Sequence, residues 1–450
     1  MNPSAFFLIV CMLGNSASAE TPRLRLELPE VEKAAEDNSP TLRAVQSDWL
    51  AAQGRGDSRR SDLWPRLTLD GNYKYLSEVP SLSLAPGRSQ SFGDNNNYSI
   101  GPTLSWTLWD QGALRDAWRS ADSAAKAKSE EYRAARRQVR LSTRLAYFQA
   151  QLASEQARLL GDSLRLAESQ YQDIEKRRQA GASSRTDALS AHQEVLERKR
   201  LFRQARADLA VALRELFALT GRDPGCDLSL PLGAAMPPPM PAGVEPASVL
   251  VALDSPADLQ RGLSAAEASP PDESHPAVQA FGSLAESSRR AARSARAGLW
   301  PKVLFSARTS LDYPNGPVLE SFNQNTIGVV ASIPLFEAGR TGREAAQLDS
   351  QARAGDWRKE AVKQDLMRDW LKAKDQLLGL RSQKEINEQA VAESKELARL
   401  IYDSYKGGQS TFIEVETANL RELETRTQSA KTDSRILMQL AVLESLSERE

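Results

Sequence analysis

Two similar turn segments interrupt very long helical patterns in this chain. The first, GASSRTDALSA, covers residues 181–191, and the second, GQSTFIEVETA, covers residues 408–418. In both, hydroxyl residues follow the leading Gly two and three positions later, an acid follows six positions later, and an Ala follows ten positions later. A long helical pattern leads into each turn and a shorter one leads away. The sequence is therefore one hairpin unit written twice, which constrains the fold more than chain length does.

The segments that precede the two hairpins repeat as well. A helical pattern is broken at Pro40 and stops at Leu63-Trp64-Pro65, and the second half matches it from Pro276 to Leu299-Trp300-Pro301. We therefore expect a first repeat at 20–221 and a second repeat at 275–450. Residues 222–274 are rich in Pro and Gly, so we expect an equatorial linker that wraps the outside.

Four segments alternate polar and apolar residues, which predicts strands with two different faces. They cover about 66–76, 97–109, 302–313 and 325–336. Strands of about 9 to 11 residues are long enough to cross a bilayer when tilted. A soluble two-faced sheet fits the alternation equally well, but the flanking long helices leave no apolar layer to cover such a sheet. Because four strands cannot close a barrel, membrane insertion requires several chains to share one.

Four long helices follow from the remaining patterns. They are expected at 113–180, 186–220, 340–406 and 411–447, and at about 1.5 Å per residue the longest reach about 100 Å. Their apolar residues recur in narrow seams, which leaves a wide polar face. The seams are Leu141, Leu145, Phe148, Leu152, Leu159 and Leu166 in the first repeat, and Leu366, Trp370, Ala373, Leu377 and Leu380 in the second. Taken by themselves, these helices fit an ordinary coiled coil. The predicted strands and the leader favour a hollow, tube-shaped assembly instead.

Residues 1–19 are typical of a signal peptide. An apolar run covers residues 5–13, and Ala17-Ser18-Ala19 supplies the small residues expected before a cleavage site. No run of about 18 apolar residues follows. We therefore expect export, and no helix that spans the inner membrane.

Charge, cysteine and histidine usage argue against several classes of function. The chain has 58 basic and 59 acidic residues, for a net charge of −1, so we expect no nucleic-acid partner. Its two cysteines are Cys11 in the leader and Cys226 in the linker. The two histidines, His192 and His275, lack ligand-spaced partners, and we expect both to be solvated. No catalytic motif occurs, and we expect neither a cofactor nor a metal.

The order of these features resembles the TolC family of outer-membrane efflux proteins over nearly the whole mature chain. The resemblance rests on the paired halves, the Leu-Trp-Pro stops, the WDQG and FEAG segments that close the second strand of each pair, and the two Gly turns. It implies an α+β membrane protein in which a homotrimer forms a 12-stranded outer-membrane β-barrel, with four strands per chain, continuous with a long periplasmic α-helical barrel. It also implies contact with outer-membrane lipid, a periplasmic membrane-fusion adaptor and an inner-membrane pump of RND or ABC type.

The resemblance further implies where the functional residues lie. The two Gly turns become periplasmic tips, with adaptor docking at Gly181, Ser184, Thr186, Gly408, Ser410 and Thr411. The channel entrance is expected at Arg185, Asp187, Tyr405, Glu414 and Glu416. Glycine supplies the positive φ of each turn, and Ser183, Ser184, Ser410 and Thr411 can cap the returning helices. Alternatively, Asp187 and Glu414 are simply favourable first-turn acids on a helix dipole.

The expected function is export of small molecules, drugs or metal ions through a passive outer-membrane conduit. One alternative is the outer-membrane conduit of a type I protein secretion system. Another is a periplasmic coiled-coil adaptor or scaffold, which also uses long antiparallel hairpins. Two hairpins, each preceded by a pair of strands of bilayer length, fit a channel better.

Overall fold

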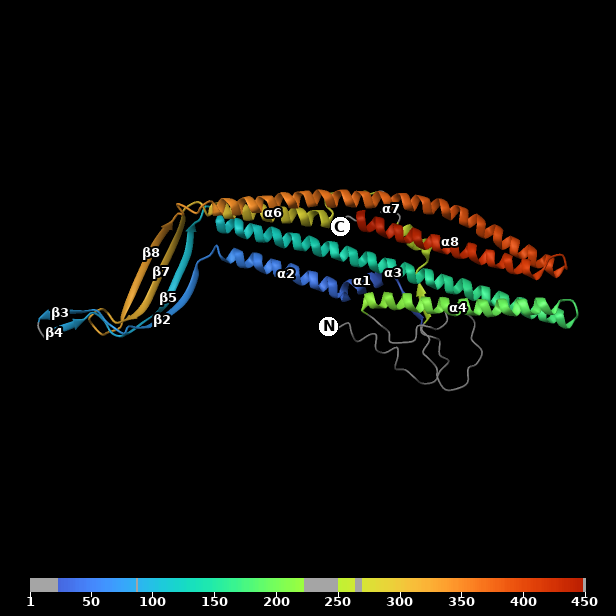
Figure 1. The fold of residues 1–450 in the computed structure, drawn as a ribbon, viewed down its shortest axis with the longest axis horizontal. Coiled ribbons are helices and arrows are strands. Elements are labelled where there is room, and N and C mark those ends of the chain that lie inside the picture. Colours follow the sequence, from blue (N-terminus) through green and yellow to red (C-terminus); the bar gives the residue numbers. More distant parts are fainter. Residues whose placement is uncertain (1–22, 86–87, 222–249, 264–268, 448–450) are drawn as a thin grey trace, which may run out of the picture. The chain divides into compact units, whose positions relative to one another are not determined.

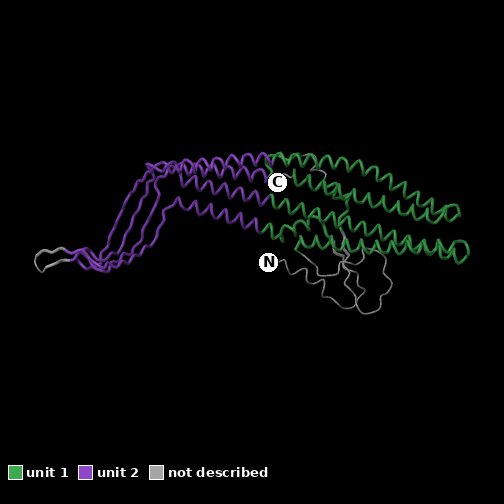
Figure 2. Tube along the Cα trace, in the orientation of Figure 1, with its two compact units in different colours: residues 1–43, 134–275, 363–450 green, residues 44–133, 276–362 purple. Residues whose placement is uncertain are grey.

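The computed structural model describes residues 23–85, 88–221, 250–263 and 269–447. The expected signal peptide at 1–19, Cys226 and the linker residues 222–249 lie outside these ranges. The chain divides into two compact units (Figure 2). Unit 1 contains residues 1–43, 134–275 and 363–450, and unit 2 contains residues 44–133 and 276–362. Each unit takes residues from both repeats, because equivalent segments of the two halves pack against each other.

Unit 2 contains a four-stranded antiparallel sheet (Figure 1). Its strands are β2 (Arg66–Tyr75), β5 (Asn96–Trp109), β7 (Lys302–Tyr313) and β8 (Phe322–Ser332), in the order β2-β5-β7-β8. The sheet thus joins the two repeats through the pairing of β5 with β7. A separate hairpin, β3 (Ser81–Ala85) with β4 (Arg88–Ser91), lies between β2 and β5 in the chain.

The last strand lies earlier in the sequence than its pattern predicts. β8 begins at Phe322 and ends at Ser332, whereas the alternation predicted a strand over about 325–336. Pro334 has no N–H to donate to a ladder, so pairing cannot continue through it. Leu335 and Phe336 are therefore outside the strand, and their side chains are 91% and 89% exposed.

The register of the sheet places most polar side chains on one face and most apolar side chains on the other. One row across the four strands contains Leu67, Leu104, Ala307 and Ile327. The next row contains Thr68, Thr103, Arg308 and Thr326. Because neighbouring residues of a strand point to opposite faces, these rows lie on opposite faces of the sheet. The apolar face is open: Leu69 is 72% exposed and Ile327 is 76% exposed.

Helices α2 (Pro40–Ser61) and α6 (Pro276–Ala297) lead into the two strand pairs. Ser39 begins α2 by accepting a hydrogen bond from the backbone N–H of Leu42 at 3.2 Å, and Pro40 suits the first helical position because it has no N–H. In unit 2, α6 packs closely on the long helix α7 (Arg340–Lys406): a Cβ at Gly355 would lie 2.9 Å from the Cβ of Ala285.

Unit 1 is built around helices that follow the strands and the turns. They are α1 (Leu28–Asn38), α4 (Arg185–Thr220), α5 (Pro256–Leu263), α8 (Phe412–Ser447) and parts of α3 (Ala113–Gln179) and α7. A two-stranded parallel sheet pairs β1 (Arg23–Leu26) with β6 (Leu250–Leu253). Among the described residues, none of the helices has the length and apolar character needed to cross a membrane.

The buried side of α3 differs from the predicted leucine seam. Phe148 and Leu159 are buried as expected, but Leu166 is 44% exposed. Small residues make up much of the rest of the buried stripe, namely Ala146, Ala150, Ala153 and Ala157, and Tyr147 is buried among them. Alanine lets neighbouring helices approach closely, so burial follows the shape of the helix surface as well as its hydrophobicity. In the second repeat Trp370, Ala373 and Leu377 are buried as predicted.

An ion-pair network fastens α1 to α3. Glu36 pairs with Arg136 at 2.7 Å and with Arg140 at 3.1 Å. Arg144, which is only 8% exposed, pairs with Glu32 of α1 at 2.5 Å and with Glu444 of α8 at 2.9 Å. A buried guanidinium needs such partners, because an uncompensated charge at that depth is costly.

His275 is half-buried, so the expectation that it is solvated was wrong. Burial lowers its pKa to about 4; nearby Arg137 acts in the same direction, and Asp272 and the backbone of Ser445 oppose them. The unfolded chain, with an ordinary pKa of about 6.5, takes up this proton first. The contribution of His275 to the free energy of unfolding is therefore fully present above pH ~6.5, and it is lost as the pH falls towards 4.

Replacing His275 with Gln should therefore reduce the acid sensitivity of the fold. We expect the wild-type protein to lose about 1–2 kcal/mol more than the variant between neutral pH and the lowered pKa, after allowance for partial exposure. The measurement is the thermal midpoint of the detergent-extracted protein at both pH values. His192→Gln, at an exposed position, serves as the control. Equal pH dependence of wild type and His275→Gln would contradict this assignment.

Candidate functional site

The two Gly turns end helices α3 and α7 in the same way. Gly181 and Gly408 both have φ of +77°. In the first turn, the N–H of Ala182 donates to the carbonyl of Arg177 at 2.8 Å and that of Gly181 donates to Arg178 at 3.0 Å. The second turn repeats this pattern, with Gln409 donating to Ser404 at 3.0 Å and Gly408 donating to Tyr405 at 3.0 Å. This paired arrangement satisfies the last helical carbonyls and requires a left-handed residue.

The returning helices begin with matching capping boxes. In α4, the N–H of Asp187 donates to Ser184 Oγ at 3.0 Å, and the N–H of Ser184 donates back to Asp187 Oδ2 at 3.4 Å. In α8, the N–H of Glu414 donates to Thr411 Oγ1 at 3.4 Å, and the N–H of Thr411 donates to Glu414 Oε2 at 2.9 Å. Two of the three predicted entrance acids, Asp187 and Glu414, thus stabilise a helix start.

The two turns, which are far apart in sequence, share one hydrophobic cluster. Its buried members are Ile174, Ala188, Ala191, Phe412 and Val415, with Tyr171, Ile401, Tyr402 and Tyr405 packed around them. Polar contacts also cross between the repeats. Ser183 Oγ lies 3.4 Å from the hydroxyl of Tyr405, and Arg177 donates to the carbonyl of Lys406 at 3.3 Å. The two turns therefore form one double tip in unit 1.

The remaining predicted residues occupy different places on this double tip. Thr186 Oγ1 lies 2.7 Å from Ser184 Oγ, and Arg185 is exposed. Ser410 and Tyr405 are half-buried, and the Tyr405 ring lies 5.7 Å from that of Phe412. In the described part of the chain, no hydrogen bond joins Asp187 to Glu414. The docking and entrance roles of these residues stay predictions.

Glu416 lies in a charged group between the two returning helices. Its neighbours on α4 are Glu194 and Arg198, which pair with each other, and Arg198 is only 4% exposed. Burial raises the pKa of the Glu416 carboxyl, the Glu194 carboxylate acts in the same direction, and Arg198 opposes both. Glu416 is therefore easier to protonate than an ordinary glutamate.

Several residues that join the two turns were missed from the sequence. The hydroxyl of Tyr402 donates to Asp173 at 3.1 Å, and burial together with this carboxylate raises the pKa of Tyr402 to about 12. Asn419 donates to Gln170 at 3.0 Å. The spacing between the two repeats could have revealed the apolar cluster, because Ile174 and Ile401 are the same number of residues apart as Asp187 and Glu414.

Replacing Gly181 or Gly408 with Ala should loosen the tip locally. No atom lies within 4 Å of a Cβ at either position, so the cost is the left-handed backbone alone, about 1 kcal/mol. We expect amide hydrogen exchange in the affected turn to rise about five-fold. Gly379→Ala is the matched control, because this helical Gly also has open space around it and no positive φ. If amide hydrogen exchange is unchanged in both tip variants, the left-handed backbone does not strain an Ala at these positions.

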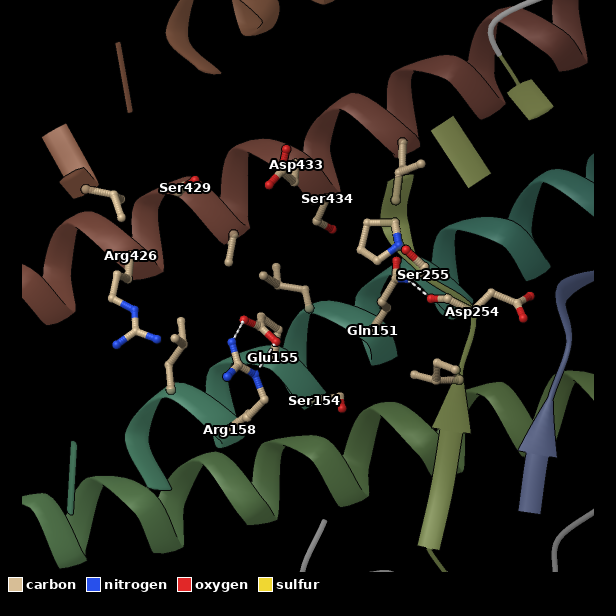
Figure 3. Close-up of a pocket in the computed structure, with 17 residues that line it drawn as sticks. Gln151, Ser154, Glu155, Arg158, Asp254, Ser255, Arg426, Ser429, Asp433 and Ser434 are labelled. Atoms are coloured by element: carbon tan, nitrogen blue, oxygen red, sulfur yellow. Dashed lines mark hydrogen bonds and ion pairs between the residues drawn. The ribbon is translucent and has the colours of Figure 1, made fainter. Parts of the chain in front are cut away.

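Unit 1 also contains a cavity of about 550 Å³ between α3, α8 and the β6–α5 connection (Figure 3). Arginine and carboxylate side chains line it, but their charges are compensated within the protein. Arg158 pairs with Asp162 at 3.2 Å, Arg426 with Glu422 at 3.4 Å, and Asp433 with Lys384 at 2.8 Å. Asp254, which also lines the cavity, accepts a hydrogen bond from the backbone N–H of Leu28 at 2.9 Å. Most of the charge that lines this cavity is therefore balanced by neighbouring side chains of the protein.

Within the described ranges, no group of three or more His, Cys, Asp or Glu side chains could hold a metal ion. The tip residues instead form turns, caps and a packed cluster.

A protein-family model described as outer membrane efflux protein matches residues 32–222 and 272–447. The chain is also 30% identical over 166 residues to Protein CyaE of Bordetella pertussis, a match that covers 35% of each chain. The chain thus matches only about a third of the length of this curated relative.

Solved structures of similar fold cover nearly the whole chain. A membrane protein from Pseudomonas aeruginosa matches with a TM-score of 0.71 and 19% identity, over 97% of each chain. The outer membrane protein VceC from Vibrio cholerae matches with a TM-score of 0.71 and 18% identity, over 93% of this chain and 96% of that one. At these identities the likeness shows the shared α+β fold.

Proposed function

Because this chain belongs to the outer membrane efflux protein family, we propose that it docks to a periplasmic adaptor and an inner-membrane pump and exports small molecules, drugs or metal ions. As a member of this family, the chain is an outer-membrane efflux channel that extends into the periplasm, and it is not an enzyme. The pump, of RND or ABC type, would supply the energy. The channel itself would be passive.

The observation that carries this proposal is the sheet of unit 2. One face carries many exposed apolar side chains, such as Leu67, Leu69 and Ile327. Strands β2 and β8 are the edges of the sheet, with no further strand beside them among the described residues. In a bilayer, unpaired edge groups cost several kcal/mol each, so the edges need partners from other chains. A homotrimer that closes twelve strands into one barrel, in contact with outer-membrane lipid, satisfies this requirement.

The double tip supports the docking part of the proposal. Ile413 and Leu189, which lie beside the two capping boxes, are 69% and 56% exposed. An adaptor hairpin could bury these side chains against the turns of Gly181 and Gly408. Because each chain carries both turns, a trimer would present six such turns to the adaptor.

The first test is the native mass of the protein extracted by detergent from washed outer membranes. A mass near three chains, reduced to that of a monomer by heating, is the expected result. A soluble monomer or dimer would mean that the sheet does not enter a bilayer.

Glu414 tests the entrance part of the proposal. If three copies of this carboxylate face the lumen, Glu414→Gln should shift the reversal potential of the purified channel towards lower cation preference. Gln keeps an oxygen that can accept the capping hydrogen bond of Thr411. Unchanged selectivity would show that this carboxylate does not face the lumen.

A further inference from the structure

All six charged residues of the four-stranded sheet lie on one face. They are Arg66, Asp70, Lys74, Lys302, Arg308 and Asp312. The register places them in the same alternating set, since Thr68 pairs with Thr103 and Thr103 pairs with Arg308. The opposite face carries no charge on any of the strands. Such complete separation is typical of a sheet with lipid on one side and water on the other.

The charge on this face is unbalanced. Four residues are cationic and two are acidic, which leaves a net charge of +2 per chain. Within the described residues, none of the four cations has a carboxylate at ion-pair distance. Arg308 Nη2 donates to a neutral group, Ser99 Oγ, at 2.7 Å. The Asp70 carboxylate on the same face interacts with Arg308 electrostatically but forms no ion pair with it, so the positive charge of Arg308 is only partly balanced within the sheet.

Arg308 is also central on this face. Its row contains three threonines, so the guanidinium is the one charged group among short hydroxyl side chains. A fixed cation on the water-facing side of a low-dielectric wall raises the local concentration of anions near it. Three copies of the sheet would multiply this effect.

We propose that the polar face of the sheet, with Arg308 at its centre, selects anionic solutes in the outer-membrane segment of the channel. This inference rests on the proposed function, because it requires the polar face to line the passage. It differs from the entrance proposal, whose acids lie in the turns of unit 1. The chemical class of solute favoured by the sheet is a small organic or inorganic anion.

The test uses cysteine probes in the full-length protein in outer membranes. Ser306→Cys, in a Cys226→Ser background, places a thiol two residues from Arg308 on the same face. Ser306 is exposed and lies opposite Ser105 and Gly328, so there is room for the thiol. Its modification rates are measured with two impermeant methanethiosulfonates, one carrying a sulfonate and one a trimethylammonium group. The ratio of the two rates, relative to free cysteine, reports the local potential.

We expect the anionic reagent to be favoured, and Arg308→Gln to lower the rate ratio about three-fold or more. Arg308→Lys, which keeps the charge, should preserve the ratio. If Arg308→Gln does not assemble, Lys302→Gln is the second variant, because Lys302 is an exposed cation at the start of the same strand. The inference would be overturned if the rate ratio does not favour the anionic reagent. It would also be overturned if the ratio is the same in Arg308→Gln as in the protein that keeps Arg308.

Ala307→Cys separates this failure from failure of the proposed function. Ala307 lies opposite Leu104 and Ile327 on the apolar face, so its thiol should be protected by lipid from both reagents. If Ala307→Cys reacts as fast as Ser306→Cys, the two faces do not border lipid and water, and the channel proposal fails as well. If only Ser306→Cys reacts but the charge of the reagent makes no difference, the channel stands and the anion selection is wrong.

Discussion

Gly101→Ala is expected to abolish the pairing of the two repeats in the sheet. A Cβ at this position would lie 2.0 Å from the carbonyl oxygen of Thr309 and 2.5 Å from Cα of Ser310, so the backbone of β7 would have to move. The recorded pairs of β5 and β7 skip Gly101 and its neighbour Pro102, which has no N–H to donate. We expect a loss of about 4 kcal/mol or more in stability.

The measurement for Gly101→Ala is the amount of heat-labile oligomer in washed outer membranes. We expect little or none, because separation of β5 from β7 splits the sheet into two strand pairs. Gly71→Ala provides the matched control in the same sheet, since the nearest atom to its added Cβ is Ile100 Cγ1 at 3.9 Å. Normal oligomer with Gly101→Ala would show that β5 and β7 do not approach so closely.

Tyr147→Ala should strongly destabilise unit 1. The side chain is fully buried in the core, and its hydroxyl links three segments. It donates to the carbonyl of Leu26 at 2.7 Å and accepts from the N–H of Asp254 at 2.8 Å. Loss of the ring leaves a cavity and two unpaired backbone groups, and we expect a loss of about 3–5 kcal/mol.

Tyr147→Phe separates the contribution of the buried ring from that of the hydroxyl group. It keeps the ring but removes the hydroxyl that joins β1 to the residue after β6, so we expect a smaller loss of about 1–3 kcal/mol. The readouts are the denaturation midpoint and amide exchange at Asp254. Tyr132→Phe is the control, because the Tyr132 ring stacks on Trp49 at 5.8 Å and no hydrogen bond of its hydroxyl is recorded in the described residues. Equal midpoints for Tyr147→Phe and Tyr132→Phe would contradict the role of the hydroxyl.

Local patterns predicted most of the secondary structure. Period-two alternation located the strands and their two faces. The end of β8 was misplaced because Pro334 was not treated as a stop, and its start at Phe322 is three residues earlier than predicted. Gly181 and Gly408 located the turns, because a left-handed residue is needed there and Gly adopts it without steric cost. These signals depend on neighbouring residues alone, which is why they are visible in a sequence.

Contacts between distant segments could not be predicted in the same way. The polar links from Tyr402 and Tyr405 to the first turn depend on two helices from different repeats lying side by side. His275 is half-buried because other elements cover it, although its own neighbours in sequence are polar or Pro. The parallel pairing of β1 with β6 likewise joins segments that carry no shared pattern.

The sequence by itself therefore determined the repeat, the two faces of the strands and the tip turns, because periodicity and backbone conformation are local properties. Only the tertiary structure decided that compact units form from halves of both repeats, that β5 pairs with β7, and that both turns share one cluster. Those outcomes depend on which surfaces fit together at close range, as the approach of Gly101 to Thr309 shows. Such complementarity is a property of the folded surfaces, and no single stretch of sequence contains it.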